Sequence, residues 1–314
     1  MHIDLAYLYR LVVRPLVWVI LAAYFLFAFA LVVVRYAVLP AIDDYRPGIE
    51  RMVGRAIGAS VTIGRIDAEW LGLHPSFELS SVQVSDSSGQ PGLNLPRVSA
   101  ILSWRSLLVL EPRLLRLQLD APELDARRDA QGHYWIAGWE VDPQARGGSR
   151  EGLDWLLAQR EVVVRGARLR WNDALREAPP LEIGNVAFVM RNTGRHHRAA
   201  LRAEPPAGLG SMLDVRVDFT HGWFTLDAAD PQQWRGSLYV ALDRIDLAGW
   251  RPWLDLPGEL SKGAGTLRTW VDYDRGHVSA GTAQLALRTL GMRLGPALPP
   301  LDGASLAGRA ELAP

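Results

Sequence analysis

Apolar and polar residues alternate along most of the chain beyond residue 60, and this alternation limits the possible folds more than any other feature. In the segment MLDVRVDF, the apolar residues Leu213, Val215, Val217 and Phe219 occupy every second position, with charged residues between them. Successive side chains of a strand point to opposite faces of a sheet, so this pattern predicts strands with one apolar and one wet face. Further apolar-face positions on the same pattern are Leu115, Leu117, Leu119, Leu238 and Val240.

Roughly a dozen or more such runs follow one another, with glycine, proline and aspartate turns between them, as in antiparallel β structure. A barrel, a sandwich and one long curled sheet would all fit this periodicity. A loose similarity between residues 61–128 and 161–220 favours the extended sheet. We therefore expect a mainly β fold, in which a transmembrane helix precedes a long, curled, mostly antiparallel sheet that forms a groove, with a few short helices.

The transmembrane helix is predicted from residues 15–34, a run of twenty residues without a charge. A cleaved signal peptide is the alternative, because Ala28-Phe29-Ala30 resembles a cleavage site, but four apolar residues follow it. Arg10 and Arg14 favour a cytoplasmic N-terminus, although arginines after the run partly cancel this bias. The anchor residues predicted to face lipid are Leu16, Trp18, Phe25, Phe27 and Val34.

We predict three shorter helical segments, one before the strands and two that interrupt them. Apolar spacing predicts an amphipathic helix over 46–57, with Asp44 as its N-cap and Gly58 as its stop. Residues 150–159 follow a Gly/Arg-rich linker, and 247–256 form a short aromatic segment limited by prolines. We expect an N-terminal tail and anchor over 1–40, a first β-groove segment over 41–145, and a second over 146–314 that is truncated at its C-terminal end.

Composition and motifs give no support for catalysis or for nucleic-acid binding. Basic and acidic residues balance at 34 each, and there is no cysteine. His196 and His197 are adjacent, so on a strand they face opposite sides and cannot share a metal ion; we expect solvated loop histidines. The segment Lys262–Arg268 lacks the glycine spacing of a phosphate loop and is expected to be a flexible turn. We predict no catalytic, metal or cofactor site.

Two stretches, read in order, resemble the YhdP-like branch of the AsmA-like family of Gram-negative bacteria. The first contains YRPGIERMVGRAIGASVTIGRIDAEWLGLHPSFELSSVQVSD and VSAILSWRSLLVLEPRLLRLQLDAPELDARRDAQGHYWIAG. The second runs from VVVRGARLRWND through WRGSLYVALDRIDLAGWRPWL to KGAGTLRTWVDYDRG. The resemblance covers the chain from about residue 8 and lies in linked patterns of Arg, Gly, Trp and strand hydrophobes. Members of this family are several times longer.

The resemblance implies an inner-membrane anchor, a periplasmic body and transport of phospholipid toward the outer membrane. Exposing roughly 30 methylenes of a phospholipid to water would cost about 24 kcal/mol, so a carrier needs a continuous apolar surface. We expect the apolar-face residues named above to line that groove, with phospholipid acyl chains, the inner membrane and other envelope proteins as partners. The alternative is a membrane-anchored scaffold for outer-membrane assembly, whose apolar face would be filled by its own side chains. A hydrolase would need a convergent pocket.

Overall fold

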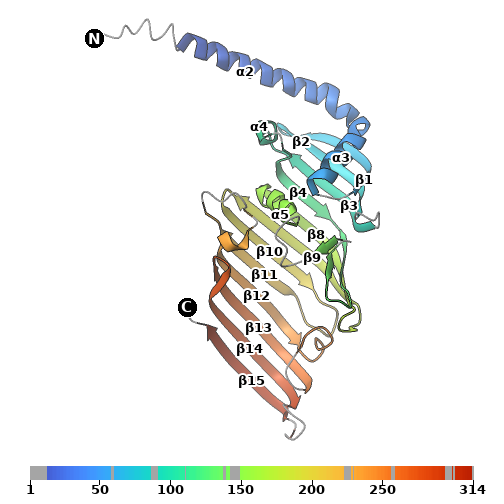
Figure 1. Ribbon diagram of the computed structural model, residues 1–314, viewed down its shortest axis with the longest axis vertical. Coiled ribbons are helices and arrows are strands. Elements are labelled where there is room, and N and C mark those ends of the chain that lie inside the picture. Colours follow the sequence, from blue (N-terminus) through green and yellow to red (C-terminus); the bar gives the residue numbers. More distant parts are fainter. Residues whose placement is uncertain are drawn as a thin grey trace, which may run out of the picture.

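The computed structural model describes residues 13–57, 60–85, 91–109, 111–136, 139–141, 149–222, 228, 230–255, 259–293, 299 and 301–312. Within them the chain forms a long helix at one end and a single 15-stranded sheet that curls away from it (Figure 1). The expected mainly β fold with a long N-terminal apolar helix is confirmed.

The N-terminal helix changes type along its length and is kinked at Ala41. Helix α2 (Arg14–Val33) passes into a π-helical turn, η2 (Val34–Val38), and a 3-10 turn, η3 (Leu39–Tyr45). None of the residues of α2 is buried, so it is not a core helix of this molecule. Twenty residues at about 1.5 Å each give a length of about 30 Å, which matches the hydrocarbon core of a bilayer. By length and composition α2 therefore fits a single-pass membrane anchor.

Four of the five predicted anchor residues lie on α2, and their contact with lipid stays a prediction. Leu16, Trp18, Phe25 and Phe27 all have exposed side chains. Val34 lies just past the end of α2, in η2, and is half-buried.

The amphipathic helix predicted over 46–57 is confirmed as α3 (Arg46–Ile57). Asp44 is not at a free helix start, because η3 runs through it and directly into α3. The predicted stop, Gly58, lies outside the described residues.

The strands follow chain order along the sheet, with one exception at its centre. The order is β1-β2-β3-β4-β8-β9-β10-β11-β12-β13-β14-β15, and the small strands β5, β6 and β7 extend from β3 and β8 beside β4. Neighbours are antiparallel except where β8 pairs in parallel with β4 and β5. The bounds are β1 Ser60–Leu71, β2 His74–Ser85, β3 Pro91–Leu102, β4 Leu114–Asp120, β5 Glu123–Arg128, β6 Tyr134–Ile136, β7 Trp139–Val141, β8 Glu161–Asp173, β9 Leu181–Thr193, β10 His196–Glu204, β11 Leu213–Thr220, β12 Arg235–Asp246, β13 Glu259–Asp274, β14 His277–Arg293 and β15 Leu301–Leu312.

The two predicted groove segments therefore share one sheet, joined by the parallel pairs of β8. The boundary near residue 146 falls outside the described residues and stays a prediction. The described short helices are α4 (Arg105–Val109), α5 (Ser149–Ala158) and η4 (Pro231–Gln233). Helix α5 confirms the helix predicted over 150–159.

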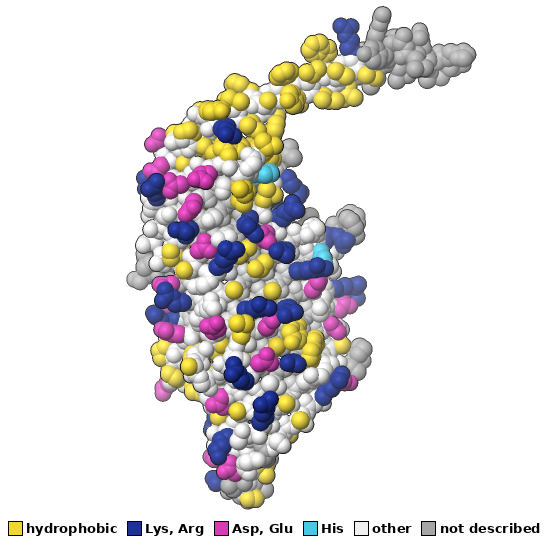
Figure 2. All heavy atoms as spheres, turned by 180° about the vertical axis from the view of Figure 1, so that it is seen from behind, with side chains coloured by type: hydrophobic (Ala, Val, Ile, Leu, Met, Phe, Trp, Pro, Cys, Tyr) yellow, Lys and Arg dark blue, Asp and Glu magenta, His cyan; other side chains and the backbone are white. Residues whose placement is uncertain are grey.

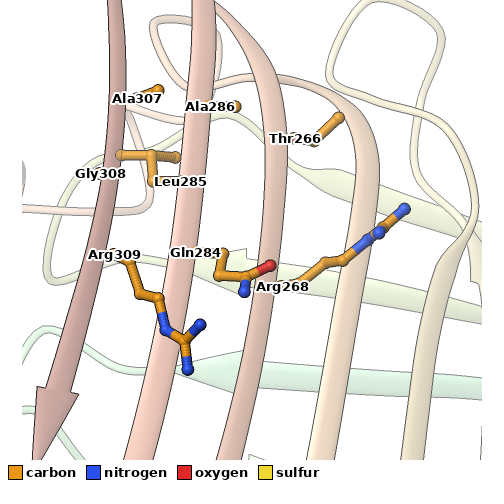
Figure 3. A pocket seen from close by; sticks show the side chains of 8 residues that line it. All are labelled: Thr266, Arg268, Gln284, Leu285, Ala286, Ala307, Gly308 and Arg309. Atoms are coloured by element: carbon orange, nitrogen blue, oxygen red, sulfur yellow. The ribbon is translucent and has the colours of Figure 1, made fainter.

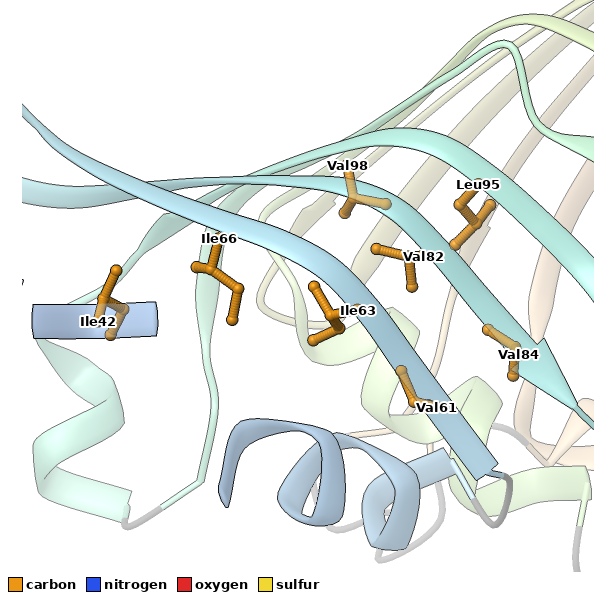
Figure 4. Close-up of a cluster of buried hydrophobic side chains, with 8 residues drawn as sticks. All are labelled: Ile42, Val61, Ile63, Ile66, Val82, Val84, Leu95 and Val98. Carbon is orange, nitrogen blue, oxygen red and sulfur yellow. The ribbon is translucent and has the colours of Figure 1, made fainter. Parts of the chain in front are cut away.

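Helix α3 protects the free edge of β1 and closes a core beneath it. The Glu50 carboxylate accepts the backbone N–H of Ile63 at 2.8 Å, and the Arg46 guanidinium donates to the Gly64 carbonyl at 2.9 Å. These bonds satisfy edge groups that would otherwise invite another strand to pair. The core below contains Ile42, Val61, Ile63, Ile66, Val82, Val84, Leu95 and Val98, with Ile49 and Val53 of α3 packed against it (Figure 4).

Two expectations about local structure were wrong. Residues 247–254 form a series of turns rather than a short helix; the backbone N–H of Arg251 donates to the carbonyl of Ala248, three residues back. The segment Lys262–Arg268 lies inside β13 rather than in a flexible turn. Its Gly265 is at a register shift where a Cβ atom would come within 2.1 Å of the Ala286 carbonyl oxygen. The glycines there allow close strand approach, which a sequence pattern does not separate from a turn.

Candidate functional site

One face of the sheet is apolar from its first strand to its last. Strand pairing aligns one residue from each strand of the main stack into a row across the whole sheet. This first row is Ile66, Leu79, Val98, Leu119, Val164, Phe188, Leu201, Val215, Val240, Thr269, Ala283 and Ala310. The only hydroxyl in it is that of Thr269, so the apolar surface is nearly continuous.

A second row runs beside the first on the same face, two residues further along each strand. It consists of Ala68, Phe77, Ala100, Leu117, Val162, Met190, Ala199, Val217, Leu238, Val271, Gly281 and Leu312. At about 4.8 Å between strands, eleven strand-to-strand steps make each row about 53 Å long. Together the rows form a band of hydrocarbon that is much longer than it is wide.

Six of the seven residues predicted to line a groove lie on these two rows. Leu119, Val215 and Val240 belong to the first row, and Leu117, Val217 and Leu238 belong to the second. The seventh, Leu115, falls in the register shift between β3 and β4, where it has no opposite residue. All seven side chains are half-buried. The structure therefore brings six of the seven predicted residues onto the two rows; whether lipid contacts them stays a prediction.

Among the residues that the structure describes, none forms a second layer over the middle of this face. Val164, Leu201, Val215, Leu238, Val240 and Val271 are all half-buried, and none belongs to a buried cluster of the described chain. Elsewhere on the same rows, Ile66, Val162 and Met190 are at most 5% exposed. The two groups differ in whether another segment of the chain packs over them. We call the half-buried middle stretch, formed by these six residues, the open trough.

Helix α5 covers one rim of the open trough. Leu157 of α5 packs with Val162, Met190 and Phe219, and Trp234 closes the cluster from the start of β12. In Figure 1 this helix lies against the sheet near the ends of β8, β9 and β10.

A buried polar network holds α5 in place. Gln159, at the end of α5, is fully buried, and its Oε1 accepts the backbone N–H of Leu114 at 2.7 Å. Asn192 of β9 donates its Nδ2 to the carbonyl oxygens of Leu156 and Gln159 at 3.3 and 2.7 Å. Since buried polar groups cost free energy unless they are paired, this network fixes the helix at one position on the sheet.

His197 completes the network, and the expectation of solvated loop histidines was wrong. Both histidines lie on β10 and face opposite sides, as their adjacency predicts. His196 contacts Asp218 at 2.6 Å on the polar face. His197 is 1% exposed on the apolar face and stacks between Phe219 and His221. Strand alternation correctly predicted that the two histidines point to opposite faces. The burial of His197, however, depends on α5 and on the stacked rings, which the local sequence does not reveal.

The hydrogen bonds of Asn192 identify which nitrogen of His197 carries the proton. Because the Asn192 amide nitrogen donates to two carbonyls, its oxygen accepts, and His197 Nδ1 donates to it at 2.8 Å. Nε2 is then an unprotonated acceptor that has no partner among the described residues. Burial, followed by the charges of His221 and His196, lowers the pKa of His197 from 6.5 to about 4.

Residues 247–255, which we call the strap, cover the opposite rim. Leu247 and Ala248 pack on Leu260, Leu287 and Leu290. The strap then runs back along the rim, where Trp250 Nε1 donates to the Leu209 carbonyl at 2.9 Å and Trp253 Nε1 to the Pro179 carbonyl at 3.0 Å. These bonds connect loops of β8–β9 and β10–β11 to β12–β13, so the strap stiffens the rim and leaves the middle open. Sequence reasoning did not identify this role.

The opposite face of the sheet is mostly polar and carries ion pairs across neighbouring strands (Figure 2). Glu161 lies between Arg116 and Arg191, and Asp218 pairs with Arg198. The hydrogen bond from Arg216, opposed by partial burial and aided by the charges of Arg216 and Arg202, lowers the pKa of Asp214. Such a face is compatible with water, as the alternation predicts.

The hollows found on the polar face carry no distinct chemistry. One, of about 480 Å³, is lined by Arg268, Gln284 and Arg309 on β13, β14 and β15 (Figure 3). Both arginines already have carboxylate partners, Asp243 and Glu311. Among the residues that the structure describes, no group of three or more His, Asp or Glu side chains is arranged to hold a metal ion.

The comparisons with known proteins agree with this geometry. The chain is 23% identical over 259 residues to the intermembrane phospholipid transporter YhdP of Escherichia coli (strain K12), covering 79% of this chain and 18% of that protein. The chain thus spans about a fifth of the length of this curated relative. No solved structure matches it significantly. The sequence profile of the YhdP protein family matches residues 1–314. The chain belongs to the YhdP protein family.

Proposed function

We propose that this chain is a segment of a non-enzymatic phospholipid conduit, in which acyl chains lie along the two apolar rows of the sheet. The observation that carries the proposal is that the two nearly continuous rows cross the whole sheet while no segment in the described part of the chain covers the open trough. A family relative named as an intermembrane phospholipid transporter supports the same substrate class.

The physical basis is the free energy of hydrocarbon in water. The cost is about 0.8 kcal/mol for each exposed methylene, so an acyl chain gains by lying on the rows wherever their side chains are not already packed against protein. Valine, leucine and alanine side chains offer no directional hydrogen bonds, so no single position holds the lipid tightly. Because neighbouring sites are nearly equivalent, lipid can move along the band in small steps.

The proposed placement follows from α2. The helix spans the inner membrane with its N-terminus in the cytoplasm, as Arg10 and Arg14 indicate, and the sheet stands in the periplasm. The polar face with its ion pairs meets water there.

The test compares two neighbouring residues of β10 that face opposite sides. Leu201 lies in the open trough, whereas Ala200 is exposed on the polar face opposite Arg216. We expect Leu201→Asp to lower the phospholipid that co-purifies with the full chain, measured by mass spectrometry, by at least tenfold. Ala200→Asp introduces the same charge and is expected to leave the bound lipid unchanged.

A scaffold whose apolar face is filled by partner proteins is the competing function. It predicts no phospholipid on the wild-type chain after mild extraction, and equal lipid content in both variants. Either result would overturn the conduit.

A further inference from the structure

The end of the sheet nearest α2 carries an exposed apolar cluster that the lipid rows do not include. The turn between β1 and β2 presents Leu71 and Leu73, which are 59% and 68% exposed, around Gly72 with its positive φ of 64°. Val109 of α4 is 45% exposed. We refer to Leu71, Leu73 and Val109 as the tip cluster. Clustered, exposed leucines on a turn indicate an interaction surface rather than a core.

Two tryptophans join the tip cluster to the anchor helix. The ring of Trp104, just before α4, lies 5.1 Å from that of Phe27 in α2, in an edge-on arrangement. Trp104 Nε1 also donates to the carbonyl of Leu73 at 3.1 Å. Arg35, just after α2, lies over the ring of Trp70 at 5.6 Å. The tip cluster is therefore held against α2 and does not hang free in solvent.

The position of Phe27 along α2 sets the depth of the cluster. Phe27 lies six residues before Val33, the last residue of α2, which is about 9 Å along the helix axis. Because α2 is only about as long as the hydrocarbon core is thick, a residue that touches Phe27 lies at or inside the membrane surface. Tryptophan is enriched in this interfacial layer, and arginine side chains near the ends of a membrane helix extend toward it.

We propose that the tip cluster inserts into the interfacial layer of the bilayer that holds α2, as a second membrane contact beside the anchor. The partner is the lipid surface itself, and not a second protein, because continuity with α2 places the cluster at that level. Two contacts fix the sheet's orientation on the membrane, which one helix with a single connecting turn does not.

This contact also places the band of hydrocarbon. Ala68, Phe77 and Ala100 of the second row lie on the strands that lead into the tip, so the proposed contact brings this end of the row toward the bilayer. Where the conduit of the previous section holds, this edge is where a lipid leaves the membrane for the sheet. The membrane contact itself rests only on α2 as the anchor.

The chain has no cysteine, so single labels are straightforward. The full chain is reconstituted in phosphatidylethanolamine/phosphatidylglycerol vesicles with an NBD fluorophore on Leu73→Cys, or on Ser237→Cys, an exposed position on the polar face of β12. Shallow doxyl-labelled lipids are expected to quench the label at residue 73 at least twofold and to leave the label at residue 237 unchanged.

Equal, weak quenching at both positions would overturn the proposal. A sheet that carries no lipid would still show quenching at residue 73, so failure of the conduit and failure of the contact give different results. Leu73 is exposed, so its replacement does not threaten the fold; circular dichroism of both labelled proteins verifies this.

Discussion

Val162 and Val164 lie on the same strand and point to the same face, yet their surroundings differ. Val162 is 3% exposed beneath Leu157 of α5, whereas Val164 is half-buried and belongs to no buried cluster of the described chain. Residue type, strand and face are identical. The difference comes from the ten-residue helix α5, which covers Val162 but does not extend over Val164.

The same contrast holds for the whole apolar face. In the described part of the chain, η3 with α3 and α5 cover parts of the rows, and the strap covers the neighbouring rim of the same face. Beneath them the face is an ordinary hydrophobic core, and between them it is a surface. The same alternating pattern therefore forms a buried core where another segment packs over the sheet and an apolar surface where none does.

The largest effect should come from charging the two valines. Val162→Asp places a carboxylate in a dry cluster without a partner, which should cost several kcal/mol and release α5 or unfold the sheet. Val164→Asp faces the open trough, where water reaches it in the lipid-free protein, so its cost should be about 1 kcal/mol. Thermal unfolding followed by circular dichroism measures both.

Equal destabilisation by the two substitutions would mean that protein also covers Val164, so that the two valines would not differ in their surroundings. Conversely, Val164→Asp should reduce co-purified phospholipid although the protein stays folded.

The next largest effect is a loss of folding stability at acidic pH. The pKa of His197 falls from 6.5 to about 4 on folding, so above pH 6.5 the residue is neutral in both states and contributes no pH dependence. As the pH drops from 6.5 toward 4, the unfolded chain takes up the proton and the folded chain does not. Stability should therefore decrease through this window by on the order of 3 kcal/mol.

Unfolding of the wild-type chain at a series of pH values measures this loss, with His197→Gln as the control. Glutamine keeps a donor for Asn192 but does not titrate. The variant should lose less stability between pH 6.5 and 4 than the wild type. Parallel profiles would show that folding does not lower the pKa of His197.

The sequence predicted those features of the fold that follow directly from the alternation of apolar and polar residues. The alternation predicted strands, the wet face, and the placement of residues such as Val215 and Leu238 on one surface, because facing depends only on neighbours along the strand. It also gave α3 and α5, whose apolar spacing is helical. It did not give the parallel pairing of β8 with β4, since register between distant strands leaves no local signal.

The sequence likewise did not show which segments cover the apolar face of the sheet. Trp250 and Trp253 reach carbonyls 41 and 74 residues away, so the segment around them looked like a short helix instead of a strap. The burial of His197 and Gln159 likewise depends on contacts between elements. Local patterns assign a side chain to a face, but only tertiary structure says what lies over that face.

The smallest effect tests how firmly the cover is held. Gln159→Ala removes the acceptor of the buried Leu114 N–H and should cost about 2 kcal/mol, most of it in local opening of α5. Gln118→Ala is the matched control, because the half-buried Gln118 bonds only to Asp120 among the described residues, and its loss should cost less than about 0.5 kcal/mol. Hydrogen exchange of the α5 amides should become faster in the first variant and stay unchanged in the second. Unchanged exchange in both would mean that Leu157 and its apolar neighbours alone keep α5 on the sheet, and the boundary between core and trough would then be set by hydrophobic packing without the polar network.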